Sequence, residues 1–162
     1  MSFLITQANS ESDLETVRRL FRAYAASLPF SLDFPGFAAE LAGLPAPYTA
    51  PAGCLLIAKP GSGAVGVVGL KPLTAGIAEI KRLYVAPEAR GTGLGRALTE
   101  RAIAEACTKG YERVRLDTHR PSMTAAIALY RRLGFVEVPP YGPDLDGQIA
   151  FFEKNLSDRR LS

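Results

Sequence analysis

Apolar and polar positions follow one another with two periods along this chain, one typical of helices and one typical of strands. Apolar residues three or four positions apart, from Leu14 to Leu28, predict an amphipathic helix over residues 12–27. Ser12 and Glu15 have the spacing of a capping box at its start, and Pro29 ends it. The first helix is therefore defined at both ends.

Short alternating or wholly apolar runs, bounded by glycine and proline, predict the strands. The predicted strands cover residues 3–8, 54–59, 64–70, 79–85, 112–118, 135–138 and 149–155, and further helices cover residues 33–42, 93–109 and 121–133. Gly66 and Gly69 interrupt one strand, which suggests a bulge or the close approach of another segment. The order of elements, β-α-α-β-β-β-α-β-α-β-β, predicts a mixed sheet with helices on both faces.

The composition is that of a globular protein and argues against several other classes. Of 162 residues, 48% are hydrophobic and 22% charged, which suits one domain, placed at residues 3–156 with a tail at 157–162. Two cysteines argue against a disulfide framework, one histidine cannot form a metal site alone, and no apolar run reaches the roughly 18 residues of a membrane span. Without such a run, and without an N-terminal basic-plus-apolar signal, we expect a cytoplasmic protein that does not bind a membrane. The net charge is +3 and no basic run is interleaved with aromatics, so we expect no binding to nucleic acid.

A glycine-spaced turn, Arg90-Gly91-Thr92-Gly93-Leu94-Gly95, joins the 79–85 strand to the 93–109 helix. Glycines leave backbone N–H groups uncovered, and the first N–H groups of a helix have no partner within it. Together with the helix dipole they form a site suited to phosphate. The turn fits neither the Walker A pattern nor the G-x-G-x-x-G/A pattern of dinucleotide-binding folds.

The Arg-x-x-Gly-x-Gly pattern of this turn resembles the acetyl-CoA pyrophosphate loop of the GCN5-related N-acetyltransferases. The segment from Ala126 to Phe135 is similar to the A-x-x-L-Y-x-x-x-G-F segment of the same family. The resemblance implies an α/β (α+β) fold with a mixed, mostly antiparallel sheet of about seven strands and about four helices on both faces. It also implies direct transfer of an acetyl group from acetyl-CoA to a primary amine of a small molecule or peptide. An acyl-CoA-binding sensor without transferase activity is the alternative, and a homodimer stays open.

Carried over residue by residue, the resemblance implies that the 79–85 and 112–118 strands diverge and that pantetheine lies between them. The cofactor-binding residues that it implies are Leu83, Tyr84, Val85, Arg90, Gly91, Thr92, Gly93, Leu94, Gly95, Arg96, Met123 and Tyr130. Arg90 and Arg96 could equally be solvated surface arginines. Met123 departs from the family, many of whose members have asparagine there, so it could instead pack against pantetheine or substrate.

Two side chains are expected to move protons. Freeing the lone pair of an alkyl ammonium at neutral pH costs about 4 kcal/mol, so a base, a water relay or desolvation is needed. The resemblance implies that Glu79 is the base and that Tyr130 protonates the departing thiolate. Glu79 could instead be a surface carboxylate paired with Lys81 or Arg113. Tyr130 could instead be a core aromatic residue without a catalytic role.

The acceptor pocket is the least defined part of the expected site. The family builds it from the first two helices, their loop and the last strands, which here points to Phe30, Phe34 and Tyr141. His119 is added to the expected pocket because it follows the 112–118 strand, near where the chemistry should occur. His119 could shuttle a proton, but its position favours a capping or surface role.

Overall fold

The computed structural model describes residues 3–29, 35–61, 63–144 and 147–156. Within them, seven strands form one sheet in the order β1-β2-β3-β4-β5-β7-β6, and only β4 and β5 pair in parallel. The strands are β1 (Leu4–Gln7), β2 (Cys54–Lys59), β3 (Gly66–Thr74), β4 (Ile77–Val85), β5 (Arg113–His119), β6 (Val136–Val138) and β7 (Ile149–Asn155). The predicted mixed, mostly antiparallel sheet is confirmed.

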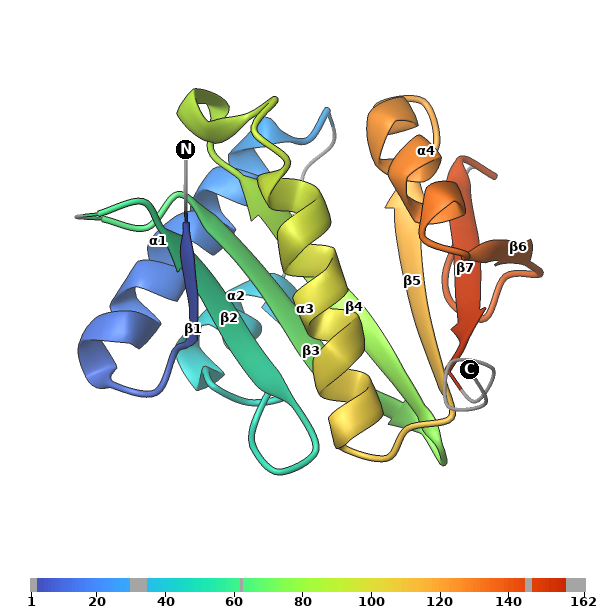
Figure 1. Cartoon of the computed structure of the whole chain (residues 1–162), viewed down its shortest axis with the longest axis horizontal. Helices are drawn as coiled ribbons and strands as arrows, with labels where there is room; N and C mark the ends of the chain where they lie inside the picture. Colours follow the sequence, from blue (N-terminus) through green and yellow to red (C-terminus); the bar gives the residue numbers. More distant parts are fainter. Residues whose placement is uncertain (1–2, 30–34, 62, 145–146, 157–162) are drawn as a thin grey trace.

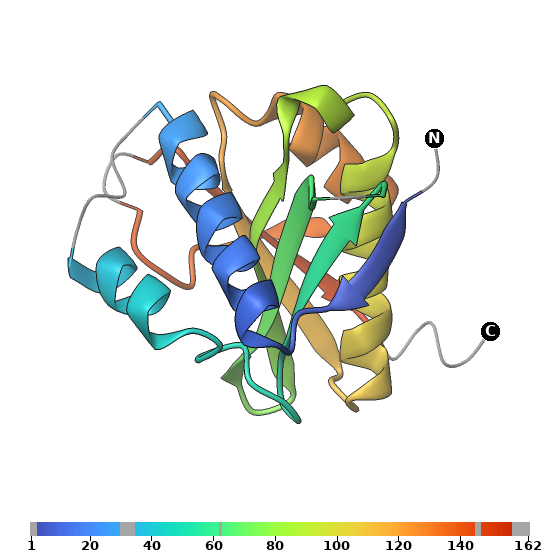
Figure 2. The same ribbon diagram turned by 90° about the vertical axis from the view of Figure 1, so that its left-hand side faces the viewer.

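Helices cover both faces of this sheet (Figures 1 and 2). They are α1 (Glu11–Ser27), α2 (Pro35–Gly43), α3 (Leu94–Thr108) and α4 (Thr124–Arg132), and a short 3-10 turn, η1 (Pro87–Ala89), precedes α3. The helices α1 and α2 lie on one face, and α3 and α4 lie on the other. Within the described ranges, none of the helices has the length and apolar character that crossing a membrane requires.

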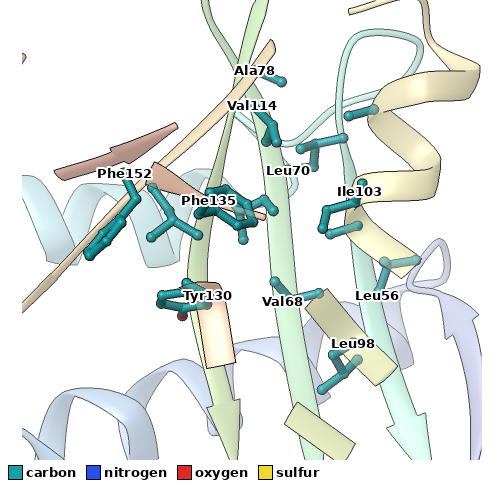
Figure 3. Close-up of a cluster of buried hydrophobic side chains, with 14 of the residues drawn as sticks. Leu56, Val68, Leu70, Ala78, Leu98, Ile103, Val114, Tyr130, Phe135 and Phe152 are labelled. Carbon is teal, nitrogen blue, oxygen red and sulfur yellow. The ribbon is translucent and has the colours of Figure 1, made fainter. Parts of the chain in front are cut away.

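Each face of the sheet carries its own hydrophobic core. Figure 3 shows the core under α3 and α4, where Val68, Leu70, Leu98 and Ile103 are almost fully buried. The other core packs α1 and α2 on the opposite face, with Phe21 among its buried residues. Burial of this apolar surface is the main source of stability, and it fixes which strand residues face which helices.

The N-cap of the first helix lies two residues earlier than its capping pattern predicted. Ser10 has extended backbone angles, and its Oγ accepts a hydrogen bond from the N–H of Asp13 at 3.0 Å. Asp13 Oδ2 accepts in return from the N–H of Ser10 at 3.5 Å. The capping box is therefore Ser10 with Asp13, and the prediction of Ser12 with Glu15 was wrong because Ser12 already lies inside the helix.

The predicted interruption of β3 is confirmed and has a partner in β4. The register of β3 with β4 shifts between Val67 and Gly69, and opposite this shift Arg82 has φ of 62°, in the left-handed region. A Cβ added at Gly69 would lie 2.7 Å from the Tyr48 ring, so the close approach also requires glycine. The bulge inserts one extra residue into β4 and changes which face the following side chains reach.

Candidate active site

Strands β4 and β5 diverge after a short paired segment. Their parallel pairing covers only Ile77 to Glu79 of β4 and Arg113 to Arg115 of β5. Strand β4 then continues to Val85 and β5 to His119, and the two strands separate visibly in Figure 1. The predicted divergence is confirmed, and it leaves backbone N–H and C=O groups on this edge of β4 without a β5 partner.

A groove of about 350 Å³ lies beside the separated end of β4. Its walls come from α1, β4, the turn before α3 and the start of α4. The lining residues are Tyr24, Ser27, Leu83, Tyr84, Val85, Ala89, Arg90, Gly91, Gly93, Leu94, Gly95, Met123, Ala125, Ala126 and Leu129. The structure thus brings together most of the residues that the sequence predicted for cofactor binding, with Thr92, Arg96 and Tyr130 outside this lining.

The start of α3 is open toward the groove. Gly91 and Gly93 have φ of 78° and 84°, a region that residues with a Cβ rarely adopt. Gly93 is the N-cap of α3 and has no side chain to cap the first N–H groups. Gly95 lines the groove, and a Cβ there would meet only a Val85 methyl at 3.8 Å. This end of α3 therefore has the properties of a phosphate site.

The two arginines of the turn lie differently. Arg90 lines the groove, and its Nε donates to the Val85 carbonyl at 3.1 Å while its guanidinium lies over the Tyr84 ring. Arg96 is exposed on α3, where its Nε lies 2.7 Å from Glu100 Oε1. Arg90 is thus placed to meet an anion in the groove, whereas Arg96 would first have to leave its partner.

Tyr130 lines a second, smaller cavity of about 40 Å³ where β4 and β5 separate. The cavity lining is Tyr24, Ile80, Lys81, Arg82, Leu83, Leu116, Asp117, Thr118, Met123 and Tyr130. The Tyr130 ring packs against Phe135 and Phe152, with centroids 5.8 and 6.4 Å away, and burial raises the pKa of its hydroxyl. Burial therefore keeps this phenol protonated, so that its O–H is available as a hydrogen-bond and proton donor to an anion that forms in the cavity.

Met123 joins the two cavities, because it lines both. Its Sδ accepts a hydrogen bond from Thr118 Oγ1 at 2.9 Å. The hydrogen bond fixes the sulfur, and the Met123 side chain lies between the groove and the Tyr130 cavity as an apolar wall.

Glu79 is buried, with 4% of its surface exposed, on the sheet face that α1 and α2 cover. Its Oε1 lies 3.4 Å from Lys71 Nζ, and its Oε2 accepts from the Tyr141 hydroxyl at 3.3 Å. Burial and the charge of Glu79 raise the pKa of Tyr141. The structure thus brings Glu79 and Tyr141 together, with Lys71 rather than Lys81 or Arg113 as the partner of the carboxylate.

The comparisons with known proteins agree with this geometry. A model of the acetyltransferase (GNAT) family matches residues 17–135. The chain belongs to the GNAT family of acetyltransferases. An uncharacterized N-acetyltransferase of Schizosaccharomyces pombe is 34% identical over 139 residues, which are 85% of each chain. An IAA acetyltransferase of Azospirillum brasilense is 43% identical over 82 residues, 50% of this chain and 53% of that relative.

Solved GNAT structures share the fold along nearly the whole chain. A GNAT-family acetyltransferase from Staphylococcus aureus superposes with a TM-score of 0.79 at 20% identity, covering 96% of this chain and 99% of that one. The PaiA N-acetyltransferase of Thermoplasma acidophilum, in complex with coenzyme A, gives 0.71 at 24% identity, covering 96% and 99%. The fold of this GNAT acetyltransferase is therefore that of the family.

His119 lies outside the lining of both cavities described above. Its Nδ1 is 2.8 Å from Ser122 Oγ, and its Nε2 is 3.2 Å from Gln148 Oε1, so the ring links the end of β5 to the segment before β7. Phe30 and Phe34, the other two residues predicted for the acceptor pocket, lie outside the described residues.

Sequence reasoning missed a buried ion pair beside the site. Arg82 donates from Nε and Nη2 to the two carboxylate oxygens of Glu40, at 3.0 and 2.9 Å, and the Tyr48 hydroxyl donates to Glu40 Oε2 at 2.9 Å. The guanidinium also lies over the rings of Tyr24 and Phe37. A signal for it existed, because two successive charged residues, Lys81 and Arg82, break the alternation of β4.

Proposed function

We propose that this GNAT acetyltransferase uses acetyl-CoA to acetylate a primary amine of a small molecule or peptide. The observation that carries the proposal is that backbone groups able to bind a CoA-like ligand follow one another along the groove. The free edge of β4 and the uncapped start of α3 border it, and Met123 connects it to the cavity of Tyr130. The CoA complex of the Thermoplasma relative supports the same ligand for this fold.

Each part of the groove suits one part of the donor. Backbone N–H groups from Gly91 to Arg96 would bind the pyrophosphate, with Arg90 adding a charge-assisted contact. The backbone groups of Leu83 and Val85 have no β5 partner and would pair with the pantetheine amides, as an added strand does. The Val85 carbonyl, which accepts from Arg90 Nε, would exchange that bond for one from the ligand. These contacts would hold the thioester at the cavity where β4 and β5 separate.

The reaction requires the amine to lose a proton and the thiolate to gain one. Acetyl-CoA supplies an activated acyl group, whose C–S bond breaks as the new C–N bond forms. Glu79 would accept the amine proton through water, because it is buried and lies outside the lining of the Tyr130 cavity. Tyr130 would share its proton with the departing thiolate, whose ordinary thiol pKa is about 8.5, through an O–H···S hydrogen bond.

A pair of variants in the first turn of α3 tests the binding mode. Gly95→Leu places a side chain in the groove, whereas Ala97→Leu places the same side chain on an exposed position of the same turn. Leucine is a good helix former, so neither change should disturb α3. We expect Gly95→Leu to weaken CoA binding in calorimetry at least tenfold and Ala97→Leu to leave it unchanged. Equal effects of the two variants would argue against this groove.

Turnover is measured as thiol release from acetyl-CoA with a broad panel of amines. Release that depends on an amine, together with the N-acetyl product in mass spectrometry, supports the transferase. Binding of CoA without release for any amine would instead favour the sensor alternative. Absence of CoA binding would overturn both.

A further inference from the structure

An ion pair crosses the opening between β4 and β5. Lys81 Nζ lies 3.7 Å from Asp117 Oδ2, and both residues lie two positions beyond the last paired residues, Glu79 and Arg115. Both also line the cavity of Tyr130. A lysine ammonium, which is itself a primary ammonium, is thus held by a carboxylate where the acceptor amine has to arrive.

The pair lies on the sheet face that α1 and α2 cover. Ile80 and Leu116, their neighbours along the two strands, point into the core under α3 and α4. Because side chains alternate along a strand, Lys81 and Asp117 point to the opposite face, together with Glu79. Glu79 lies two positions before Lys81 on β4, so the proposed base and the ion pair are neighbours on one face.

The cavity is too small for an acceptor unless part of its wall moves. About 40 Å³ holds only about three water-sized spheres. Ile80, Leu116 and Tyr130 are packed in the core, at 3%, 1% and 6% exposed. The side chains of Lys81 and Asp117 are 22% and 36% exposed, and a partly hydrated pair of this kind opens at little cost. The ion pair is therefore the part of the wall that can open.

We propose that the acceptor is a zwitterion with a carboxylate next to its amine, as in an α-amino acid. Its ammonium replaces Lys81 at Asp117, and its carboxylate pairs with the released ammonium of Lys81. A simple amine could replace Lys81 at Asp117 but would leave the lysine without an anion, whereas the zwitterion satisfies both charges. This inference rests on the proposed function and names the substrate class of the same site.

Matched acceptors test the inference. Each α-amino acid of a panel is compared with its carboxamide and with the amine that lacks the carboxyl group, for example leucine, leucinamide and 3-methylbutylamine. Thiol release from acetyl-CoA gives kcat/KM for each. We expect at least one amino acid to exceed both of its matched analogues tenfold or more.

Variants assign the effect to the pair. Lys81→Met should lower kcat/KM at least tenfold for the amino acid but should not lower it for the carboxamide, because the carboxamide has no carboxylate for Lys81 to bind. Asp117→Asn should lower both. Lys59→Met is the control, because Lys59 forms a comparable pair with Asp13 at 3.9 Å on β2, away from both cavities. Binding of CoA should not change in any of the three.

Amines without a carboxylate that react as well as the amino acids would overturn the inference and leave the proposed function intact. A Lys81→Met variant that slows all acceptors equally would overturn it too. No thiol release with any acceptor would refute the proposed function itself, and the inference with it.

Discussion

Replacing Glu40 by glutamine should cost this protein a measurable part of its stability. Glu40 accepts both hydrogen bonds of the Arg82 guanidinium and one from Tyr48, and the side chains of Glu40 and Arg82 are only 16% and 12% exposed. The glutamine variant keeps the shape but removes the charge, which leaves the guanidinium without an anion. The pair also connects α2 to the bulge of β4.

The size of the effect follows from burial. Removing one partner of a buried pair costs about 3–5 kcal/mol, and some water access together with the remaining amide oxygen reduces this to about 2–3 kcal/mol. For a domain of this size, 1 kcal/mol lowers Tm by about 2–4 °C, so the variant should melt roughly 5–10 °C lower.

The loss should depend on pH in a defined direction. Burial of Glu40 raises its pKa, but the hydrogen bonds and charge of Arg82 outweigh burial, and the pKa of the carboxyl is lowered in the folded protein. A lowered folded-state pKa contributes stability above the ordinary value of 4.5, and this stability is lost as the pH falls through the folded pKa. The difference between Glu40→Gln and the parent protein should therefore be full at pH 7 and shrink well below pH 4.5.

Urea denaturation at pH 7 and in acid measures both effects. Glu100→Gln is the control, because Glu100 forms an exposed pair with Arg96, whose loss should cost no more than about 0.5 kcal/mol. A Glu40→Gln variant as stable as the Glu100→Gln control would refute this reasoning. So would a loss that stays constant after Glu40 is protonated.

Three further substitutions address the reaction and the packing. Tyr130→Phe keeps the ring packing and removes the hydroxyl, so turnover should fall about 100-fold while CoA affinity in calorimetry is retained; unchanged turnover would exclude the acid role. Glu79→Gln should lose rate mainly at lower pH, where more of the amine is protonated, and a flat pH–rate difference would assign the proton to water or another group. Gly69→Ala forces a Cβ against the Tyr48 ring at 2.7 Å and should cost about 1–3 kcal/mol in denaturation, whereas Gly43→Ala, with open space, should not; equal stabilities would contradict the packing argument.

The parts of the fold that the sequence predicted are those set by short-range rules. The succession of helices and strands along the chain, the turn before α3 and the end of α4 at Gly134, which has φ of 94°, depend on periodicity and on local backbone preferences. The wrong capping box at the start of α1 also came from a short-range rule, because that rule alone allows two solutions. Ser10 with Asp13 and Ser12 with Glu15 both offer capping groups, and only the path of the chain from β1 decides between them.

The side-chain partners of the site could not be predicted in this way. Glu40 and Arg82 are 42 positions apart, and Tyr141 and Glu79 are 62 positions apart, so neither contact leaves a local pattern. The sequence did indicate Glu79 and Tyr141 separately, because each matched an expected position in the family. Their contact, and the choice of Lys71 as the cation, depend on how β4 packs between its neighbours.

The bulge of β4 links the packing of α2 to the proposed acceptor site. In a regular strand, Lys81 and Arg82 would point to opposite faces of the sheet, and Arg82 would enter the core under α3. Lys81 already points to the face of α1 and α2, where it meets Asp117, and the extra residue at the bulge turns Arg82 to the same face, where it binds Glu40. Leu83 and Val85 then return to the α3 side and line the groove. One backbone irregularity therefore sets a structural cation beside the cation of the proposed acceptor site and turns the proposed pantetheine edge toward α3.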